Sequence, residues 1–240
     1  MTDPAPLISC IVPVYNGARF LAETLDNILA QSWHPVEVIV VDDGSTDTTG
    51  DVLAQYAGRV RVVRQANAGP SVARNRGITE ASGTFVAFQD ADDLSPPHRL
   101  ALQSTHLANN PDDGFCVAMV QNFWEPEVAE EGRQLLGSAR SGPIAGYVTG
   151  TLLVRREALE LVGSFDPTLT HGDSADWFLR AKRLGIQGTL LDEVLLFRRL
   201  HLNNRSREFA DDSRDEFFRL LKRSLDGKRP PRSPSGGAPA

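Results

Sequence analysis

Residues 85–93 read FVAFQDADD, an apolar run that ends at once in the carboxylates of Asp90, Asp92 and Asp93. A run this short and this apolar is typical of a strand that is buried on both faces of a sheet. Carboxylates that lie so close raise one another's pKa, and the arrangement is unfavourable unless a cation or hydrogen-bond donors offset it. The stretch therefore predicts a buried strand whose end meets something positive.

Strand and helix signals alternate on both sides of this stretch. Apolar runs predict strands at 7–12, where Pro13 is expected to end the strand, and at 36–41, 60–63, 84–88, 114–123, 147–155 and 189–197. Helical spacing of apolar residues predicts helices at 19–31, 51–56, 71–81, 97–109, 156–162 and 174–184. The polar segment 125–142 has no clear period and is expected to be an exposed loop or lid.

This alternation predicts the fold class α/β, in a single domain with a Rossmann-like, mostly parallel mixed sheet flanked by helices. At 240 residues the chain is long enough for one sizeable core. Residues 226–240 are rich in Pro, Gly and Ser and cannot bury enough apolar surface to order themselves. We expect a disordered tail there.

Whole-chain properties limit the class of partner. A net charge of −6 and the lack of any block of like charges argue against a surface that binds nucleic acid. Cys10 and Cys116 lie among apolar residues without a CxxC pattern, so free, buried thiols are expected. No apolar run is long enough to span a bilayer and the N-terminus lacks the features of a signal peptide, so we expect a cytoplasmic protein without a transmembrane segment. The sequence leaves the oligomeric state open.

Polar segments follow several of the predicted strands. Ligands of open α/β sheets bind where the carboxyl ends of the strands converge, so these segments are expected to share one site, namely 13–16, 42–45 and 90–93. The last segment suits a hard cation such as Mg²⁺ or Mn²⁺, which takes few protein carboxylates and completes its shell with water and phosphate oxygens. The two adjacent acids of the second segment either belong to a turn before a helix or accept hydrogen bonds from a base edge and ribose hydroxyls.

The order and spacing of these motifs match a known family. The chain resembles family 2 glycosyltransferases of the GT-A fold at 13–16 (PVYN), 40–47 (VVDDGSTD), 67–75 (NAGPSVARN) and 88–93 (FQDADD). Later motifs extend the resemblance to about residue 206, at 163–166, 176–180 and 197–201. Such enzymes transfer a sugar from a nucleotide donor, commonly UDP-linked, to an acceptor hydroxyl with inversion at the anomeric carbon.

The resemblance also implies a division of the chain and a set of site residues. One GT-A-type domain would cover 1–225, with a nucleotide-sugar-binding half at about 7–110, an acceptor half at about 111–206 and a C-terminal helix at 207–225. The implied donor-binding residues, of which the first four would line the nucleoside pocket, are Pro13, Tyr15, Asp42, Asp43, Arg74, Asp90, Ala91 and Asp92. The implied ligands of Mg²⁺ or Mn²⁺ are Asp92, Asp90 and His201.

Two of these residues have a plain structural alternative. Arg74 could pair with Asp90 or a phosphate, or it could lie on a helix surface as an ordinary cation. His201 could close over the donor diphosphate and complete the metal shell, or it could be an exposed histidine at the end of a strand.

The catalytic base is where the chain departs from the family. An inverting transfer needs a base within reach of the acceptor hydroxyl, and the family takes it from a Glu-Asp pair before a helix. Here the aligned pair is Asp173-Ser174, and a serine cannot act as a base at neutral pH. The base is therefore Asp173, or Asp176 one helical turn on, or neither. Asp173 is preferred because Asp176 could instead cap the helix or pair with Arg180.

Three functions are compatible with these residues. The first is a metal-dependent inverting glycosyltransferase that uses a nucleotide-sugar donor, a UDP-sugar above all, and a glycan, peptide or small-molecule acceptor. The second is a noncatalytic nucleotide-sugar-binding or scaffold protein, which Ser174 favours. The third is a nucleotidyltransferase, which would need a basic, Gly-rich loop near the N-terminus, whereas 13–19 contains a single arginine.

Overall fold

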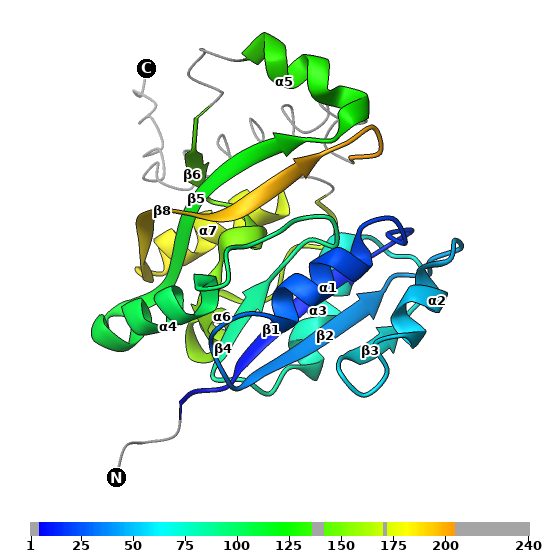
Figure 1. Cartoon of the computed structure of the whole chain (residues 1–240). Coiled ribbons are helices and arrows are strands. Elements are labelled where there is room, and N and C mark those ends of the chain that lie inside the picture. The colour runs from blue at the N-terminus through cyan, green and yellow to red at the C-terminus, as the bar shows by residue number, and fades with distance from the viewer. Residues whose placement is uncertain (1–4, 136–141, 170–171, 205–240) are drawn as a thin grey trace, which may run out of the picture.

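The computed structural model describes residues 5–135, 142–169 and 172–204 (Figure 1). The strands are β1 (Ile8–Val14), β2 (Val36–Asp42), β3 (Arg61–Arg64), β4 (Phe85–Phe88), β5 (Asp113–Trp124), β6 (Ile144–Gly146), β7 (Leu153–Arg155) and β8 (Gln187–Leu200). The helices are α1 (Leu21–Leu29), α2 (Thr49–Ala54), α3 (Pro70–Glu80), α4 (Arg99–Asn109), α5 (Ala129–Leu135), α6 (Arg156–Val162) and α7 (Asp173–Arg183), with the 3₁₀ turns η1 (Pro126–Val128) and η2 (Thr149–Thr151).

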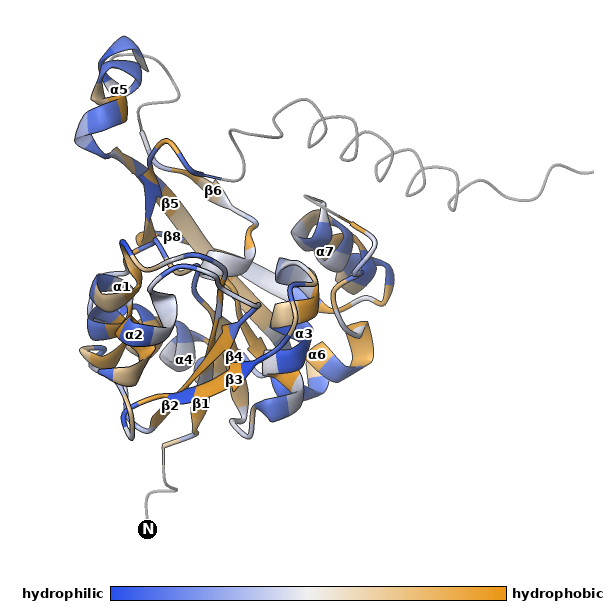
Figure 2. Ribbon diagram, turned by 90° about the vertical axis from the view of Figure 1, so that its right-hand side faces the viewer, coloured by the Kyte–Doolittle hydropathy of each residue, from blue (hydrophilic) through white to orange (hydrophobic). Residues whose placement is uncertain are grey.

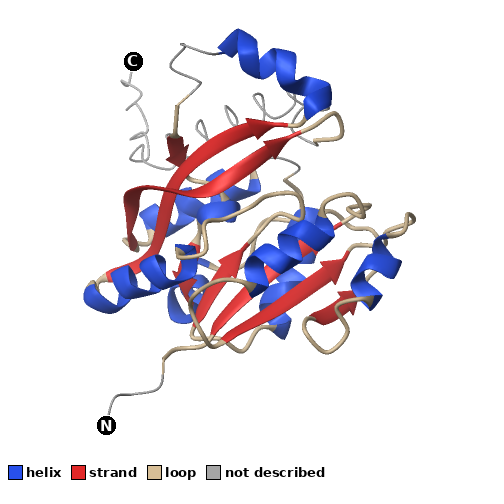
Figure 3. Cartoon of the chain, viewed as in Figure 1, coloured by secondary structure: helices blue, strands red, loops and turns tan. Residues whose placement is uncertain are grey.

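The strands form one mixed sheet in the order β3-β2-β1-β4-β7-β5-β6, and β8 pairs with β5. The pairs β1–β2, β1–β4, β2–β3 and β5–β8 are parallel, whereas β7 and β6 run antiparallel to their neighbours. Figure 3 shows the long strands β5 and β8 running together beyond the rest of the sheet toward α5. The predicted α/β fold class with a mostly parallel mixed sheet is confirmed.

Helices cover both faces of the sheet (Figure 2). Alternate residues of β1, among them Cys10 and Val12, pack with apolar residues of α1, α2 and α4. Ile11 faces the other way and belongs to the cluster that includes residues of α6 and α7. Side chains of a strand point alternately to its two faces, so an apolar run without alternation is what a strand covered on both sides requires.

Pro13 does not end the first strand, contrary to the prediction. β1 continues to Val14, whose carbonyl accepts a hydrogen bond from Asp43 N on the β2 side. The carbonyl of Ile11 accepts from Gln89 N on the β4 side, so the donor that Pro13 lacks would also face β4. Because β4 ends at Phe88, the strand loses no ladder hydrogen bond at the proline.

The second half of the chain differs more from the prediction. The expected loop at 125–142 contains η1 and α5, where Val128 is buried and Gly132 lies against the ring of Trp124. The expected strand at 147–155 is divided into η2 and β7, because Thr151 turns its hydroxyl back to the carbonyls of Gly146 and Val148. β6 was not predicted. Both the predicted C-terminal helix at 207–225 and the predicted tail at 226–240 lie outside the described residues.

Two further properties bear on the sequence analysis. Cys10 and Cys116 are free and buried, as predicted. Burial raises the pKa of the Cys10 thiol to about 11 and that of the Cys116 thiol to about 12, although Arg99 opposes the shift at both and a hydrogen bond with Gln103 opposes it at Cys116. In the described part of the chain, no helix is both long and apolar enough to cross a membrane.

The two thiols are therefore expected to be inert while the protein is folded. Only the thiolate reacts, and both burial and the raised pKa suppress it. In a titration with Ellman's reagent at about pH 8, close to the pKa of an unperturbed thiol, native protein should release almost no colour. The same sample in guanidinium chloride should titrate both cysteines. Rapid reaction of either thiol in the native protein would contradict the buried placement.

Candidate active site at the strand ends

The loops after β1 and β2 are joined by one asparagine. Asn16 Oδ1 accepts hydrogen bonds from Thr46 N at 2.8 Å and Asp47 N at 3.3 Å, and Asn16 N donates to Ser45 Oγ at 3.0 Å. Its φ of 51° is in the left-handed region, which asparagine tolerates better than most residues. No role for Asn16 was expected from the sequence, although it is the last residue of the motif at 13–16. Beside it Tyr15 is 52% exposed and Pro13 is half-buried.

The adjacent acids after β2 are both buried and both bound to backbone amides. Asp43 Oδ1 accepts from Ala68 N at 3.0 Å and from Gln65 Nε2 at 2.7 Å, and its Oδ2 accepts from Gly69 N at 2.8 Å. Asp42 Oδ1 accepts from Ser45 N at 2.9 Å. The contact of Asp42 is that of the predicted turn, whereas the contacts of Asp43 are with the segment before α3. Asp43 fixes the loop that leads into α3.

The acidic tip after β4, defined as Asp90, Asp92 and Asp93, is met by groups from distant parts of the chain. Asp90 Oδ1 pairs with Arg74 Nη2 at 3.0 Å. His201 Nε2 lies 3.0 Å from Asp92 Oδ2. Asp93 is buried and accepts from a backbone amide of β8 through Oδ1. Burial, followed by the charges of Asp92 and Asp90, raises the pKa of Asp93 well above its usual range.

A fully buried arginine binds residues just before and just after the tip. Arg99, 1% exposed, donates to the carbonyl of Phe88 at 3.1 Å and to Gln89 Oε1 at 2.6 Å, and also to Ser95 Oγ at 3.1 Å. Burial lowers the pKa of Arg99, while the nearby thiols and acids oppose that shift. The positive charge that the sequence led us to expect at the tip is therefore supplied in part by the chain itself.

Arg74 joins the tip to the first turn of α7. Its side chain is buried, and besides Asp90 it binds Asp173 Oδ2 through Nη1 at 2.7 Å. Burial acts to lower the pKa of Arg74, but Asp90 and Asp173 outweigh it and raise the pKa above the ordinary value. The predicted pairing with Asp90 is confirmed, and the alternative of a helix-surface cation is wrong. Arg74 Nε is buried without a hydrogen-bond partner among the described residues.

Both candidate bases are engaged with neighbours. Asp173 is buried; its Oδ2 also accepts from Ser71 Oγ at 2.9 Å, and its Oδ1 accepts from Ser174 N at 2.8 Å. Asp176 lies one turn further along α7 and pairs with Arg180 Nε at 2.7 Å, which is the helical i, i+4 contact considered as its alternative. Of the two, only Asp173 is linked to the acidic tip, through Arg74.

His201 is placed to share a ligand with Asp92. The ring is 7% exposed and packs 4.8 Å from that of Phe20, so the alternative of an exposed histidine is wrong. Nδ1 accepts from Asn203 N at 3.2 Å, which leaves Nε2 to carry the proton that is directed at Asp92 in the neutral form. Asn204 Nδ2 donates to the same carboxylate oxygen at 3.2 Å.

The structure offers a partial metal site at this point. Within the described ranges, no three histidines, cysteines or acids are arranged to hold a metal ion. Asp92 and His201 supply two potential ligands, and Asp90 lies on the same loop with its Oδ1 on Arg74. A cation such as Mg²⁺ commonly takes only one or two carboxylates and fills its shell with water and phosphate oxygens. The residues present therefore fit a cation that a bound diphosphate helps to hold.

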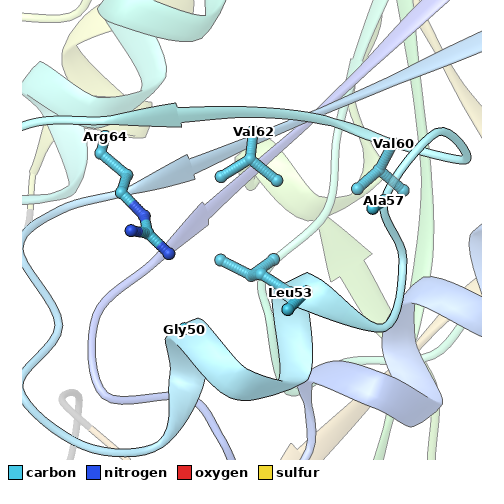
Figure 4. Close-up of a pocket in the computed structure, with 7 residues that line it drawn as sticks. Gly50, Leu53, Ala57, Val60, Val62 and Arg64 are labelled. Carbon is cyan, nitrogen blue, oxygen red and sulfur yellow. The ribbon is translucent and has the colours of Figure 1, made fainter.

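A shallow groove lies elsewhere, between α2 and the edge strand β3 (Figure 4). Its lining is mostly apolar and includes Leu53, Val60 and Val62, with Arg64 at one end. None of the acidic tip residues lines it. The candidate site is therefore a set of loops at the strand ends and not this groove. Ala91, the remaining predicted residue, is half-buried, and its carbonyl accepts from Thr24 Oγ1 at 3.1 Å.

Comparisons with known proteins place the chain among glycosyltransferases. The chain is 46% identical over 91 residues to EpsJ, an uncharacterized glycosyltransferase of Bacillus subtilis, a match that covers 37% of this chain and 26% of EpsJ. It is 27% identical over 220 residues to the glycosyltransferase GlyG of Streptococcus pneumoniae, which covers 90% of this chain and 65% of GlyG. The chain thus spans between about a quarter and about two thirds of the length of these relatives.

Solved structures with the same fold are found at lower identity. TarS 1–349 of S. aureus, in complex with UDP-GlcNAc, has a TM-score of 0.71 at 20% identity, and the match covers 91% of this chain and 65% of that one. The mannosyltransferase PcManGT of Pyrobaculum calidifontis, in complex with GDP-Man and Mn²⁺, has a TM-score of 0.67 at 23% identity, over 99% and 67% of the two chains. These likenesses confirm the predicted GT-A fold.

The family itself is shown by the sequence. The family model described as "Glycosyl transferase family 2" matches residues 9–163, which is more than half of the chain and includes every motif up to the acidic tip. The protein therefore belongs to glycosyl transferase family 2, as the resemblance of its motifs implies.

Proposed function

We propose that this chain is a metal-dependent inverting glycosyltransferase. It would move a sugar from a nucleoside-diphosphate donor, a UDP-sugar in the first instance, to a hydroxyl of a glycan, a peptide or a small molecule. The observation that carries the proposal is the contact of Asp92 with His201, two residues that are 109 positions apart in the sequence. The proposal is supported by the nucleotide sugars in the TarS and PcManGT complexes and by the Mn²⁺ in the latter.

The metal would be held by Asp92 through a carboxylate oxygen and by His201 through Nε2, in place of the proton now directed at Asp92. Asp90 would contribute while its Oδ1 remains paired with Arg74. Two or three protein ligands leave the rest of the shell to water and to the donor diphosphate. When bound, Mg²⁺ or Mn²⁺ stabilises the negative charge that develops on the departing nucleoside diphosphate.

The nucleoside would lie against the loops after β1 and β2, on Pro13 and Tyr15. Asp43 already binds the loop before α3, so its contribution would be to hold that loop in shape. Asp42 would face the nucleoside directly; its Oδ1 accepts from Ser45 N, and its Oδ2 lies 3.6 Å from Arg64 Nε. Asn16 would fix the spacing of the two loops and hence the width of the pocket.

Asp173 is the proposed base, and Oδ1 is the atom that would accept the proton. Its Oδ2 is occupied by Arg74 and Ser71, whereas Oδ1 has the single backbone donor Ser174 N. These contacts orient the carboxylate and engage both of its oxygens. The second candidate function, a noncatalytic nucleotide-sugar-binding protein, is favoured by this same observation and by Ser174.

Asp92→Asn tests the metal site. The amide keeps the shape of the side chain but removes the charge, so the affinity for UDP in the presence of Mn²⁺ should fall by at least about tenfold, and each tenfold loss is about 1.4 kcal/mol. Isothermal titration of UDP with and without Mn²⁺ measures this. Asp112→Asn, an exposed residue in the turn before β5, is the matched control and should behave as the wild type. An affinity for Asp92→Asn within twofold of the wild-type value would contradict the proposal.

Asn16 provides a test of the nucleoside pocket that needs no metal. Glycine at this position keeps the left-handed backbone but removes the acceptor for Thr46 N and Asp47 N, whereas alanine also disfavours the backbone conformation. Because a hydrogen bond contributes about 1 kcal/mol, metal-free UDP should bind roughly three- to tenfold more weakly to Asn16→Gly. Asn16→Ala should be weaker still. Equal affinity of all three proteins would show that the loops do not depend on Asn16.

The base is tested by turnover with a panel of nucleotide sugars, read as release of nucleoside diphosphate. Asp173→Asn should lose about a hundredfold or more in rate, because general base catalysis commonly contributes that much. Asp176→Asn should stay within a few fold. Ser71→Ala is the control for loss of one contact to Asp173.

The same assay separates the enzyme from the binding protein. If the wild type binds UDP with Mn²⁺ but turns over no donor, and Ser174→Asp creates turnover, the second candidate function is correct. An unchanged rate in Asp173→Asn would exclude Asp173 as the base.

A further inference from the structure

Arg199, near the end of β8, also contacts the acidic tip, which Arg74 binds from α3. The residue is 5% exposed. Its Nε donates to the carbonyl of Asp92 at 2.8 Å, and its backbone N–H donates to Asp93 Oδ1 at 2.9 Å. The two ends of the guanidinium bind Glu23 Oε2 of α1, at 2.6 Å, and Glu125 Oε1 at the end of β5. This side chain of β8 thus joins α1 and the residue after β5 to the loop that carries Asp92.

Aromatic rings complete the surroundings of this guanidinium. Arg199 Cζ lies 4.5 Å from the ring centroid of Phe20 and 4.7 Å from that of Phe123. A guanidinium over an aromatic face is attracted by the ring quadrupole, and more strongly when it is buried. Phe20 also contacts the ring of His201 at 4.8 Å, so the same phenyl ring lies against both the arginine and the histidine.

The contacts of Arg199 extend to the other member of the Asp92–His201 pair. Asn204 Nδ2 donates to the carbonyl of Arg199 at 3.1 Å and to Asp92 Oδ2 at 3.2 Å. Asn204 Oδ1 accepts from the backbone N–H of His201. Asp92 is therefore held through its carbonyl, and His201 through its backbone and its ring. Arg199 binds that carbonyl and also accepts from Asn204, which binds His201.

We propose that Arg199 is a positioning residue for the Asp92–His201 pair, which it keeps at a separation of one hydrogen bond so that the pair can accept a cation with a nucleoside diphosphate. This inference rests on the proposed function. An arginine suits the task because its planar fork reaches two carboxylates and a carbonyl at once. A lysine keeps the charge but cannot make these contacts together.

The test is Arg199→Lys. The quantity measured is the Mn²⁺ factor, defined as the ratio of the affinity for UDP with Mn²⁺ to the affinity without it. Loss of a group that orients a metal ligand typically costs about 10- to 100-fold in metal affinity, so this factor should fall by at least about tenfold. The affinity for UDP without metal should stay within twofold of the wild-type value, because Arg199 contacts neither Tyr15 nor the loop after β2 in the described structure. Isothermal titration and the melting temperature of the apoprotein are measured together.

Arg19→Met is the matched control. Arg19 shares both Phe20 and Glu125 with Arg199, but its side chain is 52% exposed and its ion pairs are with Glu125 and Glu127. This variant should keep the wild-type Mn²⁺ factor. If Arg199→Lys does not fold, Glu23→Ala decides the question, because Glu23 is 57% exposed and its truncation removes one anchor of the guanidinium. A reduced Mn²⁺ factor in Glu23→Ala supports the proposal, and an unchanged factor overturns it.

Two results would overturn the inference in different ways. A lower melting temperature of Arg199→Lys with an unchanged Mn²⁺ factor would show that the residue only stabilises the fold. A wild-type protein whose UDP affinity does not respond to Mn²⁺ would overturn the proposed metal-dependent function and, with it, the role of Arg199. The wild-type titration alone therefore distinguishes the failure of the function from the failure of the inference.

Discussion

The arrangement of the site depends on how the charges of the acidic tip are balanced. Removing carboxylates from water is costly, and the cost is recovered only where donors and opposite charges are well placed. Arg74 binds Asp90, Arg199 binds the loop at Asp92, and Arg99 binds the carbonyl at the end of β4. Contacts within the chain thus hold the tip in shape.

These arginines also explain how the two halves of the chain form one site. Arg74 comes from α3 and links the tip to Asp173 at the start of α7. Arg199 comes from β8 and links the tip to α1 and to the end of β5. Each side chain thus joins the loop after β4 to an element that lies far from it in the sequence. A shift of the tip would consequently also shift Arg74 and the candidate base Asp173, which Arg74 binds.

The candidate base is the point where this chain differs most from the family pattern. Ser174 stands where a carboxylate is usual, and Asp173 is tied to Arg74 and Ser71. The same contacts that join α3 to α7 therefore fix the orientation of the Asp173 carboxylate.

The sequence alone determined the order of strands and helices over about the first 110 residues, the buried strand before the tip and the candidate residues for the site. It did so because a strand covered on both faces must be a continuous apolar run, and because the loops after such strands meet at one edge. Only the tertiary structure decided the break between η2 and β7, the helix in the segment after β5, and the contacts of Arg99 and Arg199 near the tip. Arg199 lies 107 positions from Asp92 in the sequence, and charge balance between residues so far apart leaves no local pattern.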